Sequence, residues 1–111
     1  MLIEEKVFSA LSPLVGGRVY PQIVPVQNNE YPVITYSTVA VNGNNTVCGT
    51  SDEDVHLQID IYGKDALEVL RLRQSVFDAI EQTFPGSARS NDFDSYEHEA
   101  DLYRRILEFL V

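Results

Sequence analysis

The stretch VHLQIDIYGKDALEVL, residues 55–70, changes its apolar period partway along its length. In the first half every second residue is apolar, the pattern of a strand with one buried face, at Val55, Leu57, Ile59 and Ile61. After Gly63 the apolar residues recur every three or four positions as far as Phe84, which is typical of an amphipathic helix. A strand that leads directly into a long helix predicts a sheet with that helix packed on one face.

Both ends of this helix carry local signals. Asp65 lies in its first turn, where a carboxylate accepts from free amides and favours the helix dipole. Pro85-Gly86 ends it. The roughly twenty residues between them span about 30 Å at 1.5 Å per residue, which predicts a helix that crosses a whole sheet.

Before residue 55 the sequence predicts one helix and two further strands. A helix over residues 2–12 follows from apolar residues at helical spacing: Ile3, Val7, Ala10, Leu11 and Leu14. A short strand over residues 18–24 is expected at a sheet edge, because Pro21 and Pro25 cannot donate to a ladder. Residues 31–41 are rich in β-formers and predict a third strand.

Two polar segments interrupt these elements. Residues 42–54 predict a loop of about a dozen residues between antiparallel strands, and a loop of this length in a small domain is usually functional or disordered. Residues 87–101 are polar and acidic. The segment after them, residues 102–111, has apolar residues that fit one face of a helix or one face of a strand, so its periodicity leaves both open.

Length and charge limit the classes of function. The 111 residues suit a single domain, residues 1–111. The net charge of −9 argues against electrostatic binding to nucleic acid or to an anionic membrane, since both need clustered Lys and Arg. Cys48 is the only cysteine, so no disulfide forms within the chain. The sequence shows neither a signal peptide nor an apolar run of membrane-spanning length, which predicts folding in the cytoplasm and no membrane partner.

The titratable residues do not form a pattern that indicates catalysis. His56 alternates with the core positions of its strand and is expected in solvent or in an interface. His98 stands among Glu97, Glu99 and Asp101, but the segment lacks the glycine and terminal glutamate of a calcium loop, so a solvated acidic turn is expected. We predict no enzyme activity, no cofactor and no bound metal. A small acidic module or hydrolase that uses a metal at His98 is the alternative from another class.

Four motifs in order resemble a known family. They are GRVYP at 17–21, YPVITY at 31–36, LQIDIYG at 57–63 and LYRRILEF at 102–109. With the helices between them they resemble the small tail-completion proteins of long-tailed bacteriophages and prophages, also described as tail terminators or tail-to-head joining proteins. The resemblance covers nearly the whole chain. Residues 42–54 and 91–101 match no motif of the family.

The resemblance implies an α+β fold: a mostly antiparallel sheet of about five strands, with an N-terminal helix and one long helix packed on it. It favours a strand over residues 102–110, paired with one near 88–97. It also implies a structural protein of the virion, made in the bacterial host cytoplasm. Such proteins form a ring, typically a hexamer, at the head-proximal end of the tail, where they stop growth of the tail tube and present a surface to the head.

The implied partners are other copies of the chain, the tail tube protein and the head connector protein. DNA is expected to pass through the channel without specific binding, which an acidic surface suits. A different phage neck or head-completion protein is the alternative within phage biology, because such proteins share size and ring symmetry. Subunit or tube contacts are expected from the long loop, from the outward side of the strand at 55–62 and from the one basic pair: Asn42, Asn44, Asn45, Val47, Asp52, Glu53, His56, Gln58, Arg104 and Arg105. The basic pair could also grip a phosphate or an acidic partner, but either a salt bridge within the sheet or a subunit contact is the simpler interpretation.

Overall fold

The computed structural model describes residues 2–25, 27–28, 30–41 and 54–111. Two α-helices, a short 3₁₀ turn and a five-stranded sheet follow one another along the chain. Their bounds are α1 Ile3–Leu11, η1 Ser12–Leu14, β1 Val19–Pro21, β2 Val33–Val41, β3 Asp54–Gly63, α2 Ala66–Thr83, β4 Ala88–Glu97 and β5 Leu102–Leu110. The predicted α+β class is therefore confirmed.

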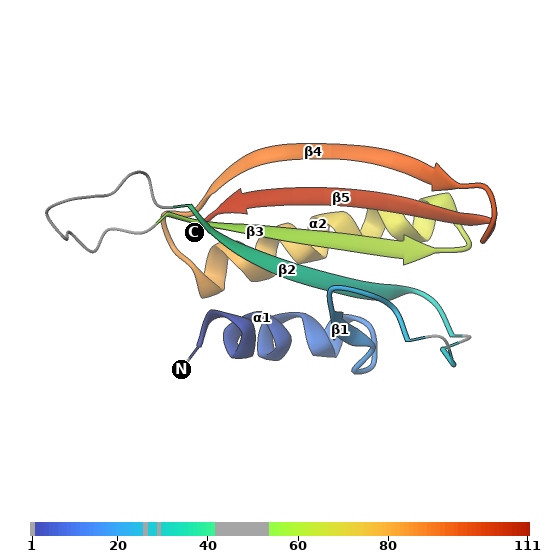
Figure 1. Cartoon of the computed structure of the whole chain (residues 1–111), viewed down its shortest axis with the longest axis horizontal. Coiled ribbons are helices and arrows are strands. Elements are labelled where there is room, and N and C mark those ends of the chain that lie inside the picture. The colour runs from blue at the N-terminus through green and yellow to red at the C-terminus, as the bar shows by residue number, and fades with distance from the viewer. Residues whose placement is uncertain (1, 26, 29, 42–53) are drawn as a thin grey trace, which may run out of the picture.

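The strands lie in the order β1-β2-β3-β5-β4 (Figure 1). All neighbours are antiparallel except β1, which runs parallel to β2 at one edge. This edge position is the one that the prolines predict, but the strand ends at Pro21 and does not reach residue 24. It ends there because Gln22 adopts a positive φ of 70° and turns the chain away from the sheet.

The ambiguous last segment is a strand, as the family resemblance implied. β5 lies between β3 and β4, and it pairs with β3 from His56↔Leu110 to Gly63↔Tyr103. It pairs with β4 from Ala88↔Leu110 to Glu97↔Leu102. Both edges of β5 are thus satisfied by backbone hydrogen bonds, which a helix over the same residues would not provide.

Both helices pack on one face of the sheet, which we call the helix face (Figure 1). The core between them is continuous. It is formed chiefly by Val7 and Leu11 of α1, Ile34 of β2, Leu57, Ile59 and Ile61 of β3, Val69, Leu72, Val76, Phe77 and Ile80 of α2, and Leu107 and Phe109 of β5. Three of the four predicted core positions of β3 are fully buried, whereas Val55, near the start of the strand, is partly buried.

The change of period at Gly63 is confirmed as the junction of β3 and α2. Asp65 caps the helix, accepting a hydrogen bond from the Leu67 backbone N–H at 3.0 Å. A Cβ on Gly63 would lie 2.7 Å from Val69 Cγ2, so the first turn of α2 packs directly against the backbone at this position. Among the described helices, none combines the length and the apolar character that crossing a lipid bilayer requires.

Candidate functional site

The predicted contact residues separate into three groups. Six of them, Asn42, Asn44, Asn45, Val47, Asp52 and Glu53, lie outside the described residues. His56, Gln58 and Arg104 project from the face of the sheet opposite the helices, which we call the open face. Arg105 follows Arg104 along β5 and therefore projects from the helix face.

A polar network occupies the centre of the open face. Asp60 of β3 is only 6% exposed, although no helix of the described chain covers this face. Its carboxylate accepts from Arg104 Nη2 at 2.7 Å, from Gln58 Nε2 at 3.1 Å and from the Tyr62 hydroxyl at 3.5 Å. The carboxylate is thus enclosed by neighbouring side chains of the sheet itself. The sequence predicted that this side of β3 faces away from the helices, but it did not predict that Asp60 is buried.

Arg104 joins this network to the outer strand. Its guanidinium also reaches Glu97 at 3.4 Å and lies over the Tyr62 ring, 5.5 Å from the ring centroid. Burial lowers the pKa of Arg104, but the hydrogen bond and charge of Asp60 outweigh it, so the pKa is raised overall. Burial, together with the negative charge of Asp60, raises the pKa of the Tyr62 hydroxyl. Asp60 and Arg104 therefore form an ion pair within the chain, and this pair favours the charged form of Arg104.

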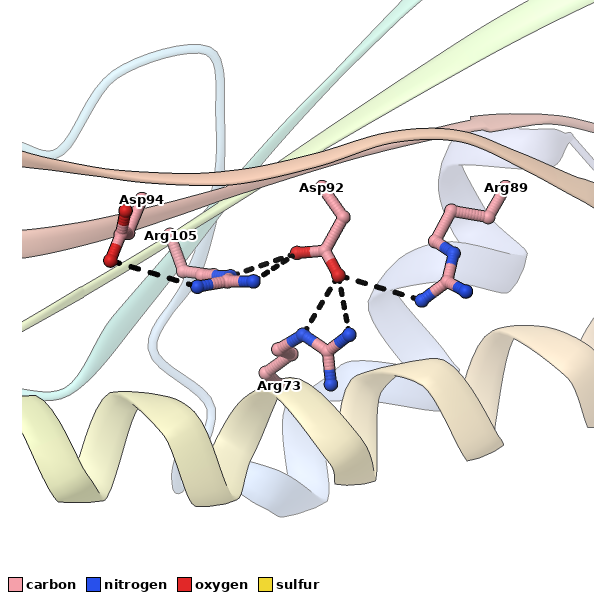
Figure 2. Close-up of polar contacts among 5 residues, drawn as sticks. All are labelled: Arg73, Arg89, Asp92, Asp94 and Arg105. Carbon is pink, nitrogen blue, oxygen red and sulfur yellow. Dashed lines mark hydrogen bonds and ion pairs between the residues drawn. The ribbon is translucent and has the colours of Figure 1, made fainter.

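The helix face holds a second, larger cluster around Asp92 of β4 (Figure 2). Arg105 of β5 donates to Asp92 Oδ1 from Nε at 2.8 Å and from Nη2 at 2.7 Å. Arg73 of α2 donates to Oδ2 through Nε at 2.9 Å and through Nη2. Arg89 of β4 approaches the same oxygen at 3.5 Å. One carboxylate thus joins a helix, an inner strand and an edge strand.

The protonation of this cluster follows from its geometry. Burial raises the pKa of the Asp92 carboxyl, but the hydrogen bonds and charges of Arg73 and Arg105 outweigh it, so the pKa lies below its ordinary value. The hydrogen bond to Asp92 raises the pKa of Arg73. Both arginines of the basic pair form salt bridges within the sheet, Arg104 with Asp60 and Arg105 with Asp92. A contact of either arginine with another subunit stays a prediction.

Two grooves flank these clusters. One, of about 510 Å³, lies between α2 and the start of β4 and is lined by Arg73, Gln74, Phe77, Glu81, Ser87, Arg89 and Phe109. The other, of about 610 Å³, lies between the connection from β1 to β2 and the β4–β5 turn. Its aromatic lining includes Tyr31, Tyr62, Tyr96 and His98.

His98 lies in the second groove and, among the described residues, is not part of a cluster of metal ligands. Its ring contacts Tyr96 edge-on at a centroid distance of 4.9 Å. The described parts of the chain contain no group of three or more His, Cys, Asp or Glu side chains that could hold a metal ion. His56 is partly buried at the end of the open face, opposite Leu110.

The sequence reasoning missed the Asp92 cluster. Its arginines stand at positions 73, 89 and 105, separated by sixteen residues each time, and nothing in their spacing links them. One signal was available: Arg73 precedes Phe77 by one helical turn and so lies beside a core position of α2. An arginine beside the core is partly buried against the sheet, and its charge therefore needs an acidic partner from the sheet.

Comparisons with known proteins address the identity of the chain. A structure titled "Virion of native gene transfer agent (GTA) particle" contains a chain of similar fold, with a TM-score of 0.64 over 97% of this chain and 91% of that chain. The two sequences are 13% identical, so this likeness concerns the fold alone. No curated protein sequence gives a significant match. The family model described as tail completion protein gp17 matches residues 6–111. The chain therefore belongs to the tail completion protein gp17 family, a family of structural proteins of phage tails.

Proposed function

We propose that this chain forms a homo-oligomeric ring, a hexamer, at the head-proximal end of a phage tail. In that place it stops growth of the tail tube and joins the tail to the head. The observation that carries the proposal is the family match over residues 6–111. Residues 1–111 then act as one domain, through assembly and not through catalysis.

Two features of the molecule support an assembly role. The described chain leaves one face of its five-stranded sheet without a helix, so that face is open to other molecules. The surface is acidic overall, with 17 acidic and 8 basic residues. A ring with such a surface repels the phosphates of DNA, so DNA passes through its channel without being held.

The proposed partners follow from this position. They are neighbouring copies of the chain, the tail tube protein on one side of the ring and the head connector protein on the other. Contacts are proposed for the segment 42–54 and for His56, Gln58 and Arg104 on the open face. Arg104 can make such a contact only in addition to its bonds with Asp60 and Glu97.

The experiment is electron microscopy of particles from a phage or particle-producing strain whose gene for this chain is deleted. Tails of irregular, excessive length that lack heads would support both parts of the proposal. Tails of normal length without heads would support the joining role alone. Defective heads beside normal tails would indicate a different neck or head-completion protein, and intact virions would refute the proposal.

A further inference from the structure

The groove between α2 and the start of β4 contains two arginines that the rest of the chain holds in place. Arg73 and Arg89 both lie over the ring of Phe77, with guanidinium carbons 4.7 Å and 4.5 Å from the ring centroid. Phe77 is itself fixed by an edge-to-face contact with Phe109 at 5.5 Å. The two guanidinium groups are therefore positioned on an aromatic surface before any ligand arrives.

Asp92 does not use all the hydrogen-bond donors of these arginines. Each guanidinium carries five N–H donors. Asp92 takes the Nε and Nη2 donors of Arg73 and one Nη1 donor of Arg89. Within the described ranges of the chain, Nε and Nη2 of Arg89 make no hydrogen bond, and that side chain is 49% exposed. The groove thus offers free, oriented donors at its rim.

The charge of the groove contrasts with that of the chain. Its lining contains two arginines and one acid, Glu81, in a protein of net charge −9, and Asp92 lies behind the arginines, where it uses only part of their donors. Ser87 and Gln74 add neutral polar groups. A fork of guanidinium N–H groups binds carboxylates in a bidentate manner. The ligand class that fits is a carboxylate, and the acidity of the remaining surface disfavours a nucleic acid.

The chain also presents exposed carboxylates, at the opposite end of the same strand. The β4–β5 turn carries Glu99 and Asp101, both exposed, and follows Glu97, the last residue of β4. Glu97 pairs with Arg104 and Asp101 accepts from the Tyr96 hydroxyl, so Glu99 is the carboxylate that pairs with no described side chain. Arg89 and Glu97 are eight residues apart on β4, which is about 26 Å at about 3.3 Å per residue. Figure 1 shows the start of β4 and this turn at opposite ends of the sheet. The groove and the turn of one chain therefore cannot meet each other.

We propose that the Arg73–Arg89 groove binds the acidic β4–β5 turn of a second copy of this chain. Two different surfaces of one subunit then meet head to tail, and a contact of this kind closes into a ring when its rotation permits. The inference rests on the proposed ring, because it supplies one contact between its neighbours. Arg89 and Glu99 are the central pair, because both are exposed.

The test measures binding in solution between the full chain and a fluorescent peptide of residues 95–103, by anisotropy at low ionic strength. We expect saturable binding that weakens about tenfold or more in Arg89→Glu. Arg71→Glu is the matched control, because Arg71 is an exposed arginine of the same helix as Arg73 and does not line the groove. The Arg71→Glu protein should bind the peptide with the same affinity as the wild type. Arg89→Gln gives a second variant with a smaller charge change, and circular dichroism checks that each protein is folded.

Reversing the charges on both partners tests whether the contact is specific. A peptide with Glu97→Lys and Glu99→Lys should fail to bind the wild type and should bind Arg89→Glu. The proposal is overturned if the acidic peptide does not bind at about 1 mM, or if Arg71→Glu weakens it as much as Arg89→Glu. It is also overturned if a short DNA duplex binds the groove and the peptide does not. Failure here together with headless tails in the deletion strain would leave the ring proposal standing and remove only this contact.

Discussion

Replacing Asp92 by Asn should destabilise the fold substantially, because it removes the charge that two partly buried arginines share. Hydrogen bonds to charged groups contribute about 1.5–3 kcal/mol each, and breaking a fully buried ion pair costs about 3–5 kcal/mol. Arg73 and Arg105 keep 24% and 16% of their side chains exposed, so water compensates part of the loss. Asn also retains one oxygen acceptor. We therefore expect a loss of about 2–3 kcal/mol in the free energy of unfolding.

Urea unfolding followed by circular dichroism measures this loss at neutral pH. With a slope of about 1–3 kcal/mol per molar urea, the midpoint should fall by about 0.7–3 M. Asp94→Asn is the matched control on the same strand, since Asp94 is 80% exposed and lies 3.8 Å from Arg105. Its effect should stay within about 0.5 kcal/mol. If the two variants lose equal stability, the Asp92 cluster does not hold β4 to α2 and the reasoning is refuted.

Three further predictions concern pH, packing and assembly. The folded-state pKa of Asp92 is lowered, so its contribution to the free energy of unfolding is fully present above the ordinary aspartate pKa of about 3.9 and is lost as the pH falls through the folded value. The difference in stability between the wild type and Asp92→Asn should therefore close on acidification. A difference that widens would contradict this. Gly63→Ala should cost about 1–3 kcal/mol because its Cβ would lie 2.7 Å from Val69 Cγ2, and Val69→Ala in the same chain should relieve part of that loss in urea unfolding. Shortening the segment 42–54 should prevent ring or tail assembly while the monomer still folds by circular dichroism, and tails of normal length joined to heads after that deletion would disprove its assembly role.

The strand, the helix and the junction between them were predictable because their signals are local. Alternation in β3, helical spacing in α2 and the cap at Asp65 each depend on a few neighbouring residues. The last segment was different, because Tyr103 and Leu107 fit both periods. Pairing of β5 with β3 and β4 decides its conformation, and β3 is separated from β5 by the whole of α2 and β4.

The polar clusters were not predictable for the same reason. Asp60 was expected on an outward side of β3, and its burial depends on Arg104, forty-four positions along the chain. The cluster at Asp92 depends on arginines from α2, β4 and β5. Sequence shows which face of a strand each side chain takes, but which ions meet on that face depends on the order of strands in the sheet.

The adjacent arginines of β5 have a consequence for strand alignment. Arg104 reaches Asp60 on the open face, and Arg105 reaches Asp92 on the helix face. A slip of β5 by one residue would exchange the two faces, so that each aspartate would lose its arginine and Leu107 would leave the core. The two ion pairs therefore act together as a lock on the register of the strand that joins the outer edge of the sheet to its centre.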